Sequence, residues 1–211
     1  MSTAPRPGLK LRAQIAQMAA KLIAKEGVAD FGSAKRKAAL RLGIDSERNL
    51  PTNVEIEQAL QEYQRLFQSQ SQPDHLHALR RTALQAMQFL EQFRPRLVGA
   101  VLLGTATEFS EITLHLYCDA AEDVAWFLNE AGIKFEQTAR IIKTAPGKSM
   151  EFPALCFIAG ETPVVLVLFT ETLEAIRPLS PVDGRPMRRA TLASFKTMVE
   201  GGHDFAASTD D

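Results

Sequence analysis

The stretch "VGAVLLGTATEFSEITLHLYCD", from Val98 to Asp119, decides the fold of the larger part of this chain. Its first half is almost entirely apolar, which predicts a central strand over Leu97 to Leu103 with both faces covered. From Glu111 to Tyr117, apolar and polar residues alternate strictly, as they do in a strand with one apolar face. Between the two strands, Gly104 and Thr105 form a predicted turn. The stretch therefore reads as an apolar strand, a Gly-Thr turn, a short polar link and an alternating strand that ends at Cys118 and Asp119.

Three amphipathic helices are predicted before this region. Leu9 to Glu26 carries apolar residues at helical spacing and stops at a glycine. A second helix can be capped by Asp30 or Ser33 and also ends at a glycine. Thr52 followed by Glu55 has the spacing of a capping box and predicts the start of a third helix. We expect these helices to pack as a small bundle.

A polar segment from Gln68 to Asp74 breaks the apolar pattern and indicates a domain boundary. We expect an α+β protein with a helical region over residues 1–72 and an α/β domain over residues 73–211, whose polar tail from Gly201 is disordered. Trp126 and Phe127 are expected in the core of that domain. Its other predicted elements are helices over His75–Phe93, Glu122–Ala131 and Met187–Val199 and strands over Lys134–Lys143, Pro153–Ile158 and Val164–Phe169.

The composition is that of a globular protein, because apolar residues make up 45% and charged residues 23% of the chain, which argues against disorder. A net charge of -1 gives no basis for a general attraction to membranes or polyanions. The longest apolar run, Pro163 to Phe169, is too short to span a bilayer, and no secretory signal is visible, so we expect a cytoplasmic protein with no membrane partner. Cys118 and Cys156 lie in apolar runs and are interpreted as buried free thiols.

Three features together carry a resemblance to a known family: the helix from His75, the segment Leu102-Leu103-Gly104-Thr105, and the alternating strand from Glu111. Over roughly residues 74–198 they resemble the core of the nucleotidyltransferase superfamily, which implies a small mixed sheet backed by helices. The phrases "EGVADFGSAKRKAALRLG" and "LPTNVEIEQALQEYQRLF" look like a group of largely uncharacterised bacterial proteins, some labelled nucleotidyltransferase-like. That narrower resemblance implies no established activity.

Working members of the superfamily have a Gly-Ser turn that approaches the nucleotide phosphates and two Asp at alternate strand positions that hold divalent metal ions. By this resemblance, Gly104 and Thr105 correspond to the turn and Glu111 to the first carboxylate. Thr113 stands at the second position, where the charge is lost. The superfamily has a third acidic residue on a later strand, and the predicted strand Val164 to Phe169 contains none. Mg²⁺ is implied only if the chain is active, with Glu111 as its candidate ligand.

One carboxylate cannot hold two metal ions, so the sequence predicts a degenerate member without two-metal catalysis that binds a nucleotide, an RNA or a protein partner. The alternative is an active nucleotidyltransferase, acting on RNA, protein or a small molecule, with carboxylates recruited from Glu108, Asp119 or Glu171. A third interpretation is a structural or regulatory module whose pocket is closed. The degenerate member is the leading interpretation.

Further candidate contacts lie on the second strand and in a late loop. His115 shares the polar face of its strand with Glu111 and Thr113, and that face either is simply wet or lines a ligand pocket. The irregular loop from Arg177 ends in "RPMRR", which places Arg185, Arg188 and Arg189 after a tight turn. Guanidinium groups in such a place suit a phosphate.

The N-terminal part of the chain is basic. Met1 to Asp45 contains nine Lys and Arg residues against three acidic ones, a net charge of +6. Within it, "AKRKAALR" places Lys35, Arg36, Lys37 and Arg41 on about two helical turns. These residues are interpreted either as a solvated basic face or as a contact with the backbone of RNA or DNA.

Overall fold

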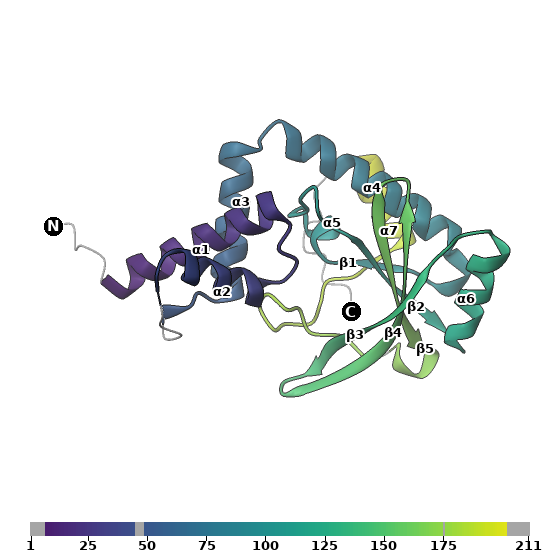
Figure 1. The fold of residues 1–211 in the computed structure, drawn as a ribbon. Coiled ribbons are helices and arrows are strands. Elements are labelled where there is room, and N and C mark those ends of the chain that lie inside the picture. The colour runs from purple at the N-terminus through teal and green to yellow at the C-terminus, as the bar shows by residue number, and fades with distance from the viewer. Residues whose placement is uncertain (1–6, 45–48, 175, 202–211) are drawn as a thin grey trace. The chain divides into compact units, whose positions relative to one another are not determined.

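The structure is a computed structural model that describes residues 7–44, 49–174 and 176–201 (Figure 1). It confirms the α+β fold, with N-terminal helices followed by a mixed sheet. The chain divides into two compact units. Unit 1 comprises Met1–His75 with Thr105–Ser110, and unit 2 comprises Leu76–Gly104 with Glu111–Asp211. The tail expected to be disordered, beyond Gly201, lies outside the described residues.

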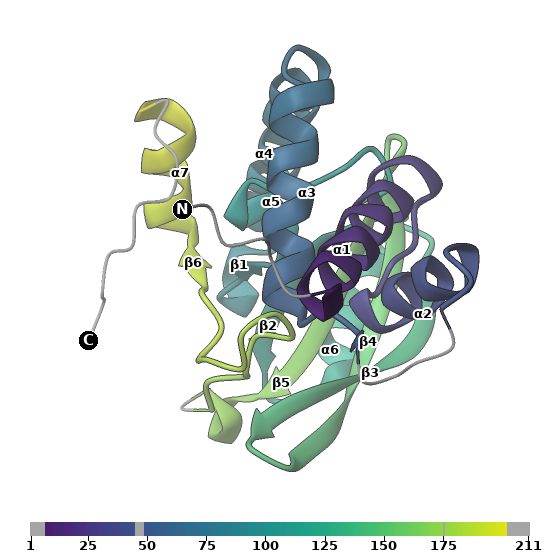
Figure 2. The same cartoon turned by 90° about the vertical axis from the view of Figure 1, so that its left-hand side faces the viewer.

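Unit 1 is built from α1 (Pro7–Glu26), α2 (Phe31–Arg41) and α3 (Asn53–Phe67), as predicted (Figure 2). Asp30 caps α2 by accepting a 2.8 Å hydrogen bond from the Ser33 amide, and the capping box at the start of α3 is complete. Small side chains dominate the core and let the helix backbones approach closely. The core residues are Ile15, Ala16, Ala19, Leu22, Ala34, Ala38, Ala39 and Ile56, with Ala20, Ala24 and Leu60 in a second cluster.

The short segment Thr105–Ser110 belongs to unit 1 although it follows residues of unit 2 in the chain. The buried side chain of Gln64, on α3, donates from Nε2 to the carbonyls of Thr105 at 3.1 Å and Ala106 at 3.2 Å. These bonds satisfy backbone acceptors that burial would otherwise leave unpaired. The segment is therefore fixed to α3.

Unit 2 is organised around a sheet of six strands among the described residues, in the order β3-β4-β5-β2-β1-β6. β2 and β5 are parallel, and the other neighbours are antiparallel. The strands are β1 (Arg96–Val98), β2 (Ile112–Cys118), β3 (Glu136–Ala145), β4 (Lys148–Ala159), β5 (Thr162–Thr170) and β6 (Ala190–Thr191). The helices are α4 (Ser71–Phe89), whose first turn lies in unit 1, α5 (Ala100–Leu103), α6 (Ala121–Glu130) and α7 (Leu192–Gly201).

β2 lies between β1 and β5 in the middle of the sheet, and both of its faces are covered, since side chains on both are buried. One face carries the predicted apolar residues, which are fully buried. On the other face His115 and Tyr117 are also buried, so the interpretation of this face as wet is wrong. Its apolar cluster consists of Tyr117, Phe152, Ala154, Val165, Val167 and Phe169.

The predicted strand over Leu97–Leu103 is wrong beyond its first two residues. β1 ends at Val98, and Gly99 adopts a φ of 77°, which a residue with a side chain rarely adopts. The next four residues form the short helix α5, whose Val101 and Leu102 are buried. A short apolar run fits a buried strand and a buried helix equally well, so periodicity could not separate the two.

Three smaller expectations are corrected as well. The polar segment before His75 is not wholly a linker, since α4 already begins at Ser71. The last helix does not begin at Met187, because β6 intervenes and pairs with β1. Trp126 is 66% exposed and not in the core. Among the described residues, no helix combines the length and the apolar character needed to cross a membrane.

Candidate functional site

Glu111 stands immediately before β2 in unit 2, and its exposed carboxylate is already engaged. Arg140, on β3, donates from Nη2 to Glu111 Oε2 at 3.3 Å. An exposed ion pair of this kind contributes little to stability, but it places a positive charge where a metal ion would have to bind. The one candidate metal ligand is therefore shared with a guanidinium group.

The alternate positions of β2 carry no carboxylate. Thr113 is half-buried, and His115 and Tyr117 follow it on the same face. Across the parallel pairing, Thr113 lies beside Val165 and His115 beside Val167 of β5. Within the described residues, no group of three His, Cys, Asp or Glu side chains is close enough to hold a metal ion.

His115 is only 1% exposed, and its ring lies 4.8 Å from the ring of Phe169. Burial, and secondly the positive charge of Arg189, lower the pKa of His115 to about 3. Its Nδ1 has no hydrogen-bond partner among the described residues. The imidazole is therefore neutral at physiological pH and shielded from any ligand in solvent.

Arg189 fixes the loop of residues 177–189 against the sheet; we call this segment the arginine loop. Its Nη1 donates to the Tyr117 hydroxyl at 2.7 Å and to the Ile176 carbonyl at 3.4 Å. Within the loop, the Met187 amide donates to the Pro178 carbonyl at 2.6 Å. The arginine loop is thus held at its base and closed by its own backbone bonds.

Arg185 and Arg188 lie in the arginine loop with exposed side chains, and neither guanidinium makes an ion pair with a described residue. The acidic residues of the preceding turn are already committed: Glu171 and Glu174 pair with Arg94. The loop therefore presents two free positive charges.

The predicted turn at Gly104 and Thr105 does not directly follow a strand, because α5 lies between β1 and Gly104. Gly104, with a φ of 82°, ends α5 and does not follow a strand. It belongs to unit 2, whereas Thr105 is buried in unit 1, where Gln64 holds its carbonyl. The glycine that directly follows β1 is Gly99.

The basic residues of α2 are largely occupied within unit 1. Lys35 Nζ donates to the Pro51 carbonyl at 2.9 Å, and Arg36 donates to the Ser33 hydroxyl at 3.3 Å. Both remaining members of the set bind one carboxylate: Lys37 and Arg41 pair with Glu26, at the end of α1. Hydrogen bonds from Arg41 and then from Lys37 lower the pKa of Glu26 to about 2. This helix face is therefore less positive than its sequence suggests.

Unit 1 contains a pocket that the sequence did not reveal, because its polar residues were interpreted as a linker. The pocket measures about 360 Å³. His75 Nε2 lies 3.2 Å from the Thr107 carbonyl on its wall, and Gln68 Oε1 is buried without a hydrogen-bond partner among the described residues. Its lining residues are Gln68, Ser71, Gln72, His75, Ala106, Thr107 and Glu108. The lining is polar and contains no cluster of charges.

The carboxylates proposed for recruitment are dispersed. Glu108 belongs to unit 1, Asp119 is exposed after the end of β2, and Glu171 is paired with Arg94. Both cysteines are free; Cys118 is buried and Cys156 is partly exposed.

In comparisons with known proteins, no family model and no curated protein matches this chain.

Proposed function

We propose that this chain is a nucleotidyltransferase-like binding module without two-metal catalysis, which holds a phosphate-bearing ligand, a nucleotide or RNA, at the arginine loop. The observation that carries the proposal is the loss of carboxylates along β2 and β5. Thr113, His115, Val165 and Val167 occupy the alternate positions, and the one acidic residue, Glu111, is paired with Arg140. Two Mg²⁺ ions need several oxygen ligands facing one another, and these positions supply no carboxylate.

The arginine loop supplies the positive side of the site. Arg185 and Arg188 are exposed, while Arg189 holds the base of the loop to Tyr117. Because guanidinium groups bind phosphate oxygens in a bidentate way, two of them on a closed loop suit a phosphate group. His115, on β2, is buried and takes no direct part.

The test is calorimetric titration of the full chain with ATP, CTP, GTP, UTP and a short single-stranded RNA, each with and without Mg²⁺. We expect binding that does not require Mg²⁺ and that weakens about tenfold for each guanidinium lost in Arg185→Ala and Arg188→Ala. The matched control is Arg81→Ala, which removes an equally exposed arginine from α4 in the same unit.

Two results would contradict the proposal. Absence of binding by every nucleotide and by the RNA would leave the arginine loop without a ligand. Binding that requires Mg²⁺ and disappears in Glu111→Ala would favour the active transferase, because Glu111 would then have to leave Arg140 and bind the metal.

A further inference from the structure

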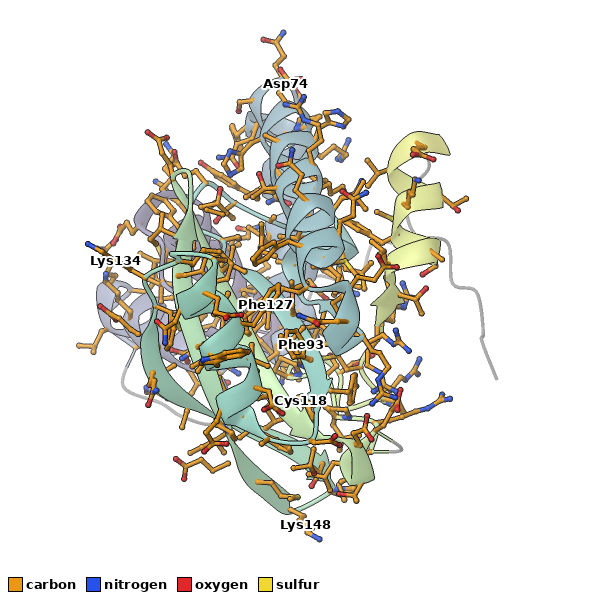
Figure 3. All side chains as sticks on the ribbon, turned by 90° about the vertical axis from the view of Figure 1, so that its right-hand side faces the viewer. Asp74, Phe93, Cys118, Phe127, Lys134 and Lys148 are labelled. Atoms are coloured by element: carbon orange, nitrogen blue, oxygen red, sulfur yellow. The ribbon has the colours of Figure 1, made fainter. Side chains whose placement is uncertain are left out.

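Helix α6, in unit 2, exposes a side chain that usually contributes to a core. Trp126 is 66% exposed, although tryptophan is on average highly buried. It is also the only tryptophan of the chain. The neighbouring Phe127 turns inward, with its ring centroid 4.9 Å from that of Phe89 and 5.4 Å from that of Phe93 (Figure 3). The inner face of α6 is therefore packed without the indole.

Acidic residues surround this indole. Glu122, Asp123 and Glu130 lie three or four positions from Trp126 in the helix, so they share its face. Asp119, just before the helix, is exposed as well. The chain contains no Lys or Arg from Asp119 to Ile133, and among the described residues none of these carboxylates is in an ion pair. We call these four acidic residues and Trp126 the α6 face.

Helix stability accounts for only part of this arrangement. Glu122 and Asp123 stand in the first turn, where the helix dipole favours negative charge. Glu130 stands in the last turn, where the same dipole disfavours it. These negative charges also act on a residue inside unit 2. Burial first, and then the charges of Asp123, Asp119 and Glu122, raise the pKa of the Cys118 thiol to about 11. The α6 face is thus more acidic than the helix requires.

We propose that the α6 face is a docking surface for an arginine-rich segment of a partner protein. An exposed indole ringed by carboxylates offers an arginine a cation–π contact on the ring and ion pairs at its edge. Tryptophan and arginine are the residue types that most often dominate protein interfaces. The charge complementarity selects a basic partner and repels nucleic acid, whose phosphates would meet four carboxylates.

The size of the surface limits the strength of the interaction. A helix of ten residues is about 15 Å long, so it presents less than the roughly 800 Å² per partner of a standard interface. The complex therefore belongs to the weak, transient class and weakens with added salt. This surface shares no residue with the arginine loop, so the docking proposal does not depend on the proposed function.

Because Trp126 is the sole tryptophan, its fluorescence reports on this surface directly. The probe is an oligo-arginine peptide, which is titrated into the full chain while tryptophan emission is recorded. The second readout is the fluorescence anisotropy of the same peptide labelled with fluorescein. We expect a saturable shift of the emission to shorter wavelength as the indole leaves water. Trp126→Ala should weaken the affinity measured by anisotropy at least about tenfold.

The charge contribution is tested with two double variants of equal charge. Glu122→Gln with Glu130→Gln should weaken binding about tenfold, whereas Glu151→Gln with Glu161→Gln, which removes exposed carboxylates from β4 and the β4–β5 turn, should not. Equal weakening by both pairs, or no saturable shift, would overturn the proposal. Emission that changes with protein concentration alone would assign the α6 face to a second copy of the chain and overturn it too.

Discussion

Arg189 Nη1 donates a 2.7 Å hydrogen bond to the hydroxyl of Tyr117, which ties the arginine loop to the middle of the sheet. The same guanidinium also reaches the Ile176 carbonyl at 3.4 Å. Tyr117 is 2% exposed, so its hydroxyl would be an unpaired buried polar group without this arginine. The contact therefore attaches the end of the loop to the sheet.

From this contact we expect Tyr117→Phe to lower the free energy of unfolding of unit 2 by about 1 kcal/mol, the net contribution of one hydrogen bond. Arg189→Ala should cost more, because it leaves both the hydroxyl and the Ile176 carbonyl without their donor. Urea unfolding followed by Trp126 fluorescence measures both variants and the double variant. Arg177→Ala, an exposed arginine at the start of the loop, is the control and should change little. Strictly additive effects of the two variants would contradict the direct contact.

His115 predicts how stability depends on pH. Its folded-state pKa of about 3 lies below the ordinary 6.5, so below pH 6.5 the unfolded state binds a proton that the folded state does not. The contribution of the neutral His115 to stability is fully present above that pH and is lost as the pH falls toward 3. The slope approaches about 1.4 kcal/mol per pH unit. Glu26 and Glu55, with pKa values of about 2, add losses of their own only below their ordinary value of 4.5.

The measurement is the urea midpoint of the full chain at several pH values between about 7 and 5.5, where the two glutamates contribute little. We expect His115→Leu to flatten this dependence, because leucine is apolar and binds no proton in either state. His77→Gln, which removes an exposed histidine from α4, should leave the slope as it is in the natural chain. An unchanged slope in His115→Leu would show that another group is responsible.

The helices of unit 1 could be predicted because the signals that end them are local. Asp30 and Ser33 stand three residues apart, as do Thr52 and Glu55, and each pair closes its hydrogen bonds as the sequence suggests. A capping motif needs no information from the rest of the chain. The helix boundaries therefore agree closely with the structure.

The candidate site could not be predicted in the same way, because distant parts of the chain decide it. Alternation correctly placed Thr113 and His115 on one side of β2. The partner that engages Glu111 is Arg140 on β3, and the ring that covers His115 is Phe169 on β5. Helical spacing likewise places Trp126 on a face of α6 without saying whether anything covers that face. Long-range pairing had to be seen in the structure.

Glu55 joins two tasks in unit 1, which makes it a sensitive position. It accepts hydrogen bonds from Arg12 Nε at 2.7 Å and Nη2 at 2.7 Å, and it closes the capping box with Thr52. The hydrogen bond from Arg12 is the main reason that the pKa of Glu55 falls to about 2. Glu55→Ala should therefore lower the free energy of unfolding of unit 1 by about 1 to 3 kcal/mol, the range for a helix cap together with a charged hydrogen bond.

Thermal unfolding followed by circular dichroism measures this change. Glu62→Ala is the matched control, because Glu62 is an exposed glutamate on the same helix. Glu55→Gln keeps the acceptor for Thr52 but removes the charge that faces Arg12, so it should lie between the natural chain and Glu55→Ala. Equal stability of the Glu55→Ala and Glu62→Ala variants would refute the double role.

Gly27 and Gly43 offer a pair of substitutions that separates backbone strain from a steric clash. Both follow helices of unit 1 and have positive φ values, 63° and 68°. A Cβ on Gly27 would lie 2.7 Å from Cγ of Phe109, whereas a Cβ on Gly43 would meet nothing within 4 Å. Gly43→Ala should therefore cost about 1 to 2 kcal/mol, the penalty of the left-handed conformation alone. Gly27→Ala should cost clearly more, because the ring must also move.

Phe109→Ala provides the decisive combination, since it removes the ring that a Cβ on Gly27 would strike. In the Phe109→Ala background, Gly27→Ala should cost no more than Gly43→Ala does in the natural chain, as measured by thermal unfolding of unit 1. An excess cost that persists without the ring would mean that the segment Thr105–Ser110 does not pack against Gly27. Disappearance of the excess would establish that contact, and with it the attachment of this segment to the helices of unit 1.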